Sequence, residues 1–182
     1  GKYSDVMLIY LCKYFNGPTK QMAELWKAAG EFQIDTFDLE ERILTQMLYT
    51  TDYTPHMEEI YESYCAGGGR DLVCMAYLSY FANMYLTEDA VVPEHVFRQI
   101  RERYLTGGDL NRVCRIALLK YLSENHLSER DRKIADELLD TCIRHNLYFA
   151  FFRKFDEKLL RKYQLTDKFF LEYHTAPGQQ IE

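Results

Sequence analysis

The chain has 182 residues, of which 47% are hydrophobic and 15% aromatic, so it can bury a core and does not have the composition of a disordered segment. Its net charge of −6 is unevenly distributed, because residues 24–62 carry ten acidic and two basic side chains, whereas residues 144–168 carry seven basic and three acidic ones. The acidic part argues against general binding of nucleic acids, which requires a basic face.

The first half of the chain predicts four helices, each preceded by a residue that favours a helix N-terminus. They span approximately residues 4–15, 18–30, 36–49 and 55–66. The residues expected at their beginnings are Ser4, Pro18, Asp35 and Thr54. In the second helix the apolar residues have the i, i+3, i+4, i+7 spacing of one buried face: Met22, Leu25, Trp26 and Ala29.

The second half predicts four more helices, separated by glycine-rich turns. They span approximately residues 71–86, 93–106, 109–124 and 128–145, and Ser128 with Asp131 forms the capping signal of the last one. The first and third of these helices are apolar almost all round, whereas the other two are amphipathic. Because a helix with apolar residues on several faces is covered on several faces, we expect alternate helices to be covered on both sides.

An internal repeat supports this pattern. Residues 6–15 and residues 113–122 are identical at five of ten aligned positions, at an offset of 107 residues, which is three steps of just under 36. The identical pairs are Val6/Val113, Ile9/Ile116, Leu11/Leu118, Lys13/Lys120 and Tyr14/Tyr121. A period near 36 is typical of helix-pair repeats. We therefore expect Val113, Cys114 and Ile116 to be buried.

The predicted fold class is all-α, a right-handed α-solenoid resembling TPR superhelices. The helical-repeat domain should span residues 1–163, with hairpins over about 4–30, 36–66, 71–106 and 109–146 and an aromatic cap over 147–163. Residues 164–182 read as a β-like tail, and we expect this tail and the abrupt start at Gly1 to mark a piece of a longer protein whose next module begins here.

Motifs that carry chemistry are weak. Gly67-Gly-Gly-Arg70 resembles an anion cradle, but it fits a helix C-terminus at a repeat junction better. The acidic residues of Glu40-Glu41 and Glu58-Glu59 are interpreted as solvated helix faces, and the five histidines as surface or packing residues without a metal pair. No catalytic residue, cofactor or metal is predicted.

Two Lys-Tyr pairs occupy equivalent points of the repeat. In a solenoid, equivalent positions line up along one surface, so a groove for an extended protein or peptide partner could include Lys13, Tyr14, Tyr80, Lys120 and Tyr121. The alternative is that each lysine extends off the edge of a covered helix while its tyrosine packs.

The cysteines and the hydropathy predict a cytoplasmic setting. None of the five cysteines forms a C-x-x-C pair, each lies on or beside an apolar stripe, and a reduced environment explains them most simply. No signal peptide and no apolar run of 18 residues is present, so we predict no membrane partner.

Several stretches resemble a family of large uncharacterised proteins from Clostridia-type Firmicutes. They are Leu25-Trp-Lys-Ala-Ala29, Leu39-Glu-Glu-Arg-Ile-Leu44, Phe149-Ala-Phe-Phe-Arg-Lys-Phe155 and Tyr163-Gln-Leu-Thr-Asp-Lys168. The resemblance covers most of the chain and implies a bacterial source, helical-repeat segments that alternate with β-rich modules, and no activity or catalytic residue.

Three functions stay open at this point. The repeat architecture favours a non-catalytic protein-interaction or scaffold module. An enzyme domain would need a carboxylate-lined or Tyr/Lys pocket with perturbed pKa values. A structural spacer between modules would place its largest exposed patches at the two ends of the stack.

Overall fold

The computed structural model describes residues 2–50, 53–88, 90–124 and 128–145, and these residues form eight α-helices and no strand. The helices are α1 (Lys2–Tyr14), α2 (Thr19–Glu31), α3 (Phe37–Thr50), α4 (Met57–Ala66), α5 (Asp71–Thr87), α6 (Glu94–Leu105), α7 (Arg112–Glu124) and α8 (Glu129–His145). The all-α prediction is therefore confirmed for this part of the chain. The predicted aromatic cap and β-like tail lie outside the described residues.

Local capping explains where several helices begin. The Asp35 carboxylate accepts a hydrogen bond from the Phe37 N–H at 3.0 Å before α3, and the Ser128 hydroxyl accepts one from the Asp131 N–H at 3.1 Å at α8. Each side chain satisfies a backbone donor that the first helical turn leaves free. Both caps were predicted from the sequence. Before α7 the same role belongs to Asn111, whose side-chain oxygen accepts from the Cys114 N–H at 2.9 Å.

The beginning of α4 differs from the prediction. The helix starts at Met57 rather than near Pro55, and the residue before it, His56, adopts a left-handed conformation with φ of 69°. The Thr54 hydroxyl contacts the Pro55 carbonyl oxygen at 3.1 Å and caps no helical N–H, and its side chain is buried. A tight turn thus replaces the expected threonine cap.

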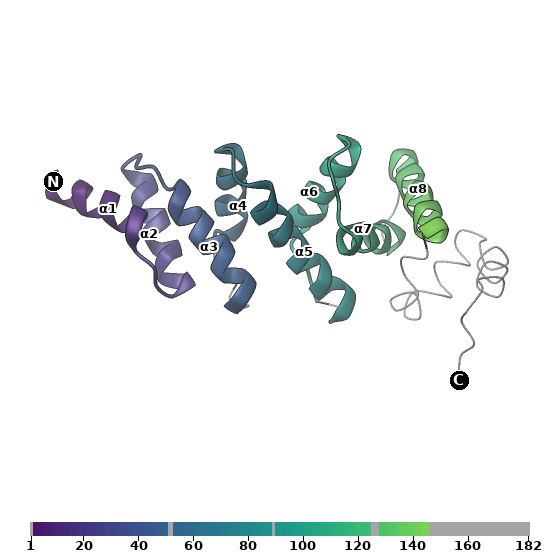
Figure 1. Cartoon of the computed structure of the whole chain (residues 1–182), viewed down its shortest axis with the longest axis horizontal. Coiled ribbons are helices and arrows are strands. Elements are labelled where there is room, and N and C mark those ends of the chain that lie inside the picture. Colours follow the sequence, from purple (N-terminus) through teal and green to yellow (C-terminus); the bar gives the residue numbers. More distant parts are fainter. Residues whose placement is uncertain (1, 51–52, 89, 125–127, 146–182) are drawn as a thin grey trace. The chain divides into compact units, whose positions relative to one another are not determined.

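The chain divides into two compact units. The first comprises Gly1–Phe81 and Pro93–Gln99, and the second comprises Ala82–Val92 and Ile100–Glu182, so α5 and α6 each contribute residues to both. In the first unit α1 packs against α2 and α3, while α3 also packs against α2 and α4. Figure 1 shows these four helices side by side in chain order. Contact between α1 and α3, the first helices of successive hairpins, is what stacked hairpins require.

The core of the first unit lies between α2, α3, α4 and the first turns of α5. Its fully buried large side chains include Met22, Leu39, Ile43, Leu44, Met47, Met57, Ile60, Tyr61, Tyr64 and Tyr77. In the second unit α7 packs against α8, and the buried residues of α7 are Cys114, Ile116, Ala117, Leu118, Leu119, Lys120 and Leu122. Burial of Cys114 and Ile116 is thus confirmed, whereas Val113 is only half-buried.

Candidate functional site

Helix α1 presents a face of exposed apolar side chains. Five of the eleven large hydrophobic residues that are exposed in the described part of the chain lie on this helix: Val6, Met7, Ile9, Tyr10 and Tyr14. Their spacing places them on one broad side of the helix, because residues three and four apart are neighbours on a helix surface. Contiguous apolar surface of this kind marks a site of interaction more often than an ordinary solvent-facing surface.

The opposite side of α1 holds the helix in the first unit. Cys12 is buried there, and burial raises the pKa of its thiol. The Arg42 guanidinium from α3 donates to the Lys13 carbonyl oxygen at 2.8 Å and also to the Cys12 carbonyl oxygen. These last-turn carbonyls have no partner within their own helix, so a cationic donor satisfies them. The exposed apolar face is therefore carried by a firmly attached helix.

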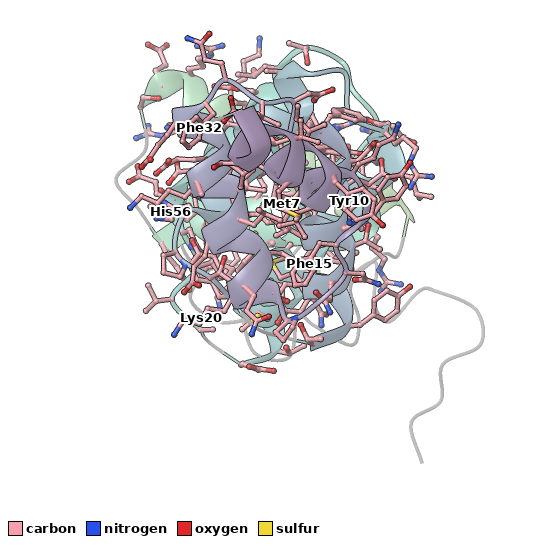
Figure 2. All side chains as sticks on the ribbon, turned by 90° about the vertical axis from the view of Figure 1, so that its left-hand side faces the viewer. Met7, Tyr10, Phe15, Lys20, Phe32 and His56 are labelled. Carbon is pink, nitrogen blue, oxygen red and sulfur yellow. The ribbon has the colours of Figure 1, made fainter. Side chains whose placement is uncertain are left out.

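Figure 2 views the first unit from the side on which the exposed residues Met7 and Tyr10 of α1 lie. It shows Met7 and Tyr10 on α1, with Phe15 just after that helix and Phe32 just after α2. Phe32 is exposed and Phe15 is half-buried. Phe32 therefore adds a further exposed apolar side chain from the end of α2. We define the α1 face as six exposed residues on this side of α1: Val6, Met7, Ile9, Tyr10, Lys13 and Tyr14.

This face corrects the expectation that the helices at alternate positions are covered on both sides. Ile9 is 52% exposed, whereas Ile116, its equivalent in α7, is 2% exposed. Tyr10 is 59% exposed, whereas its equivalent Ala117 is fully buried. The two segments share five of ten aligned residues, so even identical residues such as Ile9 and Ile116 differ in burial when their neighbours differ.

The predicted groove residues have different environments. Lys13 and Tyr14 lie exposed at the end of α1, with the ammonium 5.7 Å from the tyrosine ring centroid. Tyr80 and Tyr121 are half-buried, and Tyr80 packs edge-on against Phe81. Lys120 is only 7% exposed, and its environment is that of a lysine covered by a neighbouring helix. A common groove formed by these residues stays a prediction.

The interpretation of Glu40 as a solvated residue is wrong. Its side chain is buried, and its Oε1 accepts hydrogen bonds from Trp26 Nε1 at 2.9 Å, Thr36 Oγ1 at 2.9 Å and Ser63 Oγ at 2.6 Å. Three donors from three separate segments stabilise the carboxylate without a countercharge among them. The sequence could not reveal this, since a glutamate pair in a first helical turn also fits a surface position.

Glu41 takes part in a neighbouring network at the junction between α4 and α5. It accepts a hydrogen bond from the Tyr64 hydroxyl at 2.6 Å and pairs with the Arg70 guanidinium at 2.7 Å. The Tyr64 hydrogen bond and the Arg70 charge hold the pKa of this carboxyl below its usual range. The backbone N–H groups of Gly67, Gly68 and Gly69 all bond to carbonyl oxygens at the end of α4. The glycines thus form the predicted helix C-terminus rather than an anion cradle.

A buried tyrosine and histidine form the second polar cluster of the first unit. His95 Nε2 lies 2.8 Å from the Tyr77 hydroxyl, and His95 Nδ1 lies 3.4 Å from a carboxylate oxygen of Glu58. Burial lowers the pKa of His95 and raises that of Tyr77, so both stay neutral near pH 7. Tyr77 also stacks on Tyr61, with ring centroids 4.2 Å apart.

The order of groups in this cluster resembles a nucleophile, a base and an orienting carboxylate. However, Tyr77 is fully buried and His95 is 2% exposed, so a substrate has no access to the reacting atoms in this structure. The three residues come from α4, α5 and α6, and no local sequence signal connects them. Their arrangement fits the packing role that the sequence assigned to the histidines.

Within the described residues no group of His, Cys, Asp and Glu side chains is arranged to hold a metal ion. No described helix combines the length and the hydropathy needed to cross a membrane.

Comparisons with known proteins gave one match. The sequence model described as the C-terminal part of a family of unknown function, DUF5717, matches residues 1–182, which is the whole chain. No curated protein and no solved structure matches it.

Proposed function

We propose that this chain, which belongs to the DUF5717 family of unknown function, is a helical-repeat module that binds a protein partner through its α1 face. The observation that carries this proposal is the concentration of exposed apolar side chains on one helix that is well anchored on its other side. Val6, Ile9 and Tyr10 are each more than half exposed. Covering such residues contributes roughly 1 kcal/mol each, about half of what full burial gives.

The architecture behind this proposal is a right-handed, TPR-like solenoid of helical hairpins. It is supported by the eight successive helices, by the contact between α1 and α3, and by the repeat that relates α1 to α7. Modules of this kind bind partners over extended surfaces rather than in closed pockets. We place the protein in the bacterial cytoplasm, which fits cysteines that are not joined in disulfides, among them Cys12, Cys65, Cys74 and Cys114.

Photo-crosslinking tests the proposal. A photoreactive phenylalanine replaces Tyr10 on the α1 face or, as a matched control, Tyr49 on α3, which is 83% exposed. In cells that make the protein, an adduct should form from position 10 and not from position 49. The adduct from position 10 should be lost when Ile9→Asp is added. With the purified partner in place of cells, the protein without Ile9→Asp should form the same adduct. Equal labelling from both positions, or an adduct that Ile9→Asp leaves unchanged, would refute the proposal.

The spacer hypothesis is the second candidate, because it too places an exposed patch on the first helix. It differs in the origin of the partner: a spacer contacts only neighbouring modules of its own polypeptide. Crosslinking from position 10 then joins two segments of the same polypeptide. Mass spectrometry should find a linked pair of peptides from that polypeptide, and its apparent mass on a gel should not increase. The enzyme hypothesis gains no support from Glu40, which is buried and accepts three internal hydrogen bonds at Oε1, or from Glu41, which is bound by Tyr64 and Arg70.

A further inference from the structure

Helix α7, which the internal repeat relates to α1, holds the equivalent lysine in a covered position. The Lys120 ammonium donates to the Tyr85 carbonyl oxygen at 3.2 Å, in the last turn of α5, and lies 4.4 Å from the centroid of the Tyr85 ring. The Tyr85 hydroxyl donates to the carboxylate of Glu124. Ile116 and Ala117 lie on the same side of α7 as Lys120, since they precede it by four and three residues, and both are buried. The C-terminal end of α5 thus covers Lys120, while α7 also packs against α8.

The first unit contains the same kind of contact. Arg42 of α3 donates to the carbonyl oxygens of Cys12 and Lys13 in the last turn of α1. In each unit, therefore, a basic side chain from the first helix of one hairpin donates to the last turn of the first helix of the hairpin before it: Arg42 to two carbonyl oxygens of α1, and Lys120 to one of α5. The charge is complementary, because the C-terminus of a helix carries a partial negative charge and unpaired acceptors.

Helix α1 carries the residues for this contact, but in the described residues no helix lies over them. Ile9, Tyr10 and Lys13 correspond to Ile116, Ala117 and Lys120 in the repeat, and all three are exposed. A lysine is stable in water, but its repeat equivalent Lys120 is buried and donates to the end of a helix. Lys13 would have the same role under a covering helix end, because its ammonium would meet the last-turn carbonyls while its stem packs.

We propose that the partner of the α1 face is an α-helix of another repeat hairpin, whose C-terminal end lies over Lys13. This inference rests on the proposed function and adds the chemistry of the partner. The last-turn carbonyls of that helix accept hydrogen bonds from the Lys13 ammonium, and its apolar stripe covers Val6, Ile9 and Tyr10. The last turn of the partner carries aromatic or aliphatic residues, as Tyr85 and Leu86 do in α5, and lacks basic residues, which would repel Lys13.

A grafted hairpin tests this directly. Residues 71–111 precede α7, so a second copy of them is joined in front of Asp5, which is the equivalent of Arg112 at the offset of 107 residues. Acetic anhydride then measures the accessibility of Lys13 under native conditions, with the exposed Lys20 of α2 as internal control. Acetylation of Lys13 should fall at least tenfold relative to the ungrafted chain, whereas that of Lys20 stays the same. Unchanged acetylation of Lys13 in a folded graft would overturn the proposal.

Two variants separate helix-end recognition from simple apolar covering. Adding Lys13→Met to the graft keeps an apolar stem but removes the donor, and hydrogen exchange of the α1 amides should then increase towards that of the ungrafted chain. Ile9→Asp should do the same. If Lys13→Met leaves the protection unchanged, a helix end is not recognised and the proposal is wrong.

A trapping experiment in trans covers the case in which the graft does not fold. A peptide of residues 71–88 carries Cys74→Ser and Tyr85→Cys, and its single thiol is activated as a mixed disulfide with thionitrobenzoate. It is added to the full chain carrying Lys13→Cys, whose thiolate displaces thionitrobenzoate as the new disulfide forms. The rate of thionitrobenzoate release is compared with that of a chain carrying Lys20→Cys. Faster trapping at position 13 supports the proposal, and equal rates contradict it. Sedimentation of the unchanged chain supplies the last arm: a dimer that Ile9→Asp abolishes but Lys13→Met leaves intact would show that a second copy covers the face without recognition of a helix end, and would overturn the proposal.

The two proposals can fail separately. If the hairpin docks in the graft but no crosslink forms from position 10 in cells, the proposed interaction function is refuted and the proposed recognition of a helix end is retained. A crosslink from position 10 that is insensitive to Lys13→Met removes the helix-end chemistry but leaves the interaction function.

Discussion

Replacing Ile9 and Ile116 by aspartate, in two separate variants, applies the same change to two positions that the repeat makes equivalent. Ile116 is 2% exposed in α7, and Ile9 is 52% exposed in α1. The helix propensity lost in the two variants is the same, a few tenths of a kcal/mol. Any larger difference between the variants therefore measures what covers each side chain.

The expected free energies differ by several kcal/mol. At Ile116 the variant loses about 1.5–3 kcal/mol of apolar burial, and an unpaired carboxylate in the same place costs several kcal/mol more. That total, about 5 kcal/mol or more, approaches the whole free energy of unfolding of a typical domain. At Ile9 only about half of the burial term is lost and the carboxylate stays in water, so we expect a loss of roughly 1 kcal/mol.

Urea unfolding followed by far-UV circular dichroism measures both changes. Because Ile9 and Ile116 lie in different compact units, the fluorescence of Trp26, the single tryptophan of the chain, reports separately on the first unit. Hydrogen exchange of the α7 amides reports on the second. Ile116→Asp should abolish protection in α7, whereas Ile9→Asp should leave both units folded. A loss of similar size in the two variants would refute the reasoning that α7 is covered and α1 is not.

Three further experiments test other parts of the structure. Gly69→Ala should destabilise the chain by about 2 kcal/mol or more, because the new Cβ would lie 2.7 Å from the Tyr64 carbonyl oxygen. Gly30→Ala in α2 is the matched control, since its Cβ meets open space, and it should stabilise the chain by about 0.5–1 kcal/mol. Urea titration measures both changes. Burial holds the pKa of His95 below its usual value of 6.5. The stability that neutral His95 provides is therefore fully present above pH 6.5 and is lost as the pH falls towards the lowered pKa. In His95→Gln the free energy of unfolding should depend less on pH between pH 7 and pH 5. The Sγ atoms of Cys65 and Cys74 lie 3.1 Å apart, so oxidised glutathione should convert these two thiols to a disulfide and release two molecules of reduced glutathione. The number of thiols titrated in the unfolded chain should fall by two after this treatment. It should not fall by two in Cys65→Ser.

The sequence predicted the helices well because their signals are local. Glycine turns, capping residues such as Asp35 and Ser128, and apolar spacing each depend on a few neighbouring residues, and the observed helices begin and end close to the expected positions. The miss at α4 is also local in origin: Thr54 and Pro55 have the composition of a helix start, but a left-handed His56 moves the start to Met57. Propensity alone does not show which of two adjacent turns the chain will choose.

The polar networks could not be predicted, since they join segments that are distant in the sequence. Glu40 receives its donors from Trp26, Thr36 and Ser63, and His95 meets Tyr77 and Glu58 from two other helices. A glutamate in the first turn of a helix has the same local pattern whether it lies in water or is held by three donors. Only the packing of the helices distinguishes the two cases.

The repeat itself contained information about the α1 face. The sequence placed Lys13 and Lys120 at equivalent points, and the groove that it predicted from them stays a prediction. In α7 the Lys120 ammonium donates to the Tyr85 carbonyl oxygen at the end of α5, a contact that no local signal predicted. Equivalent residues in a repeat have equivalent chemistry but not equivalent burial, because burial depends on the neighbour. The α1 face has Lys13 where the covered helix α7 has Lys120. We therefore infer that the neighbour of the α1 face presents a helix end, as α5 does to Lys120.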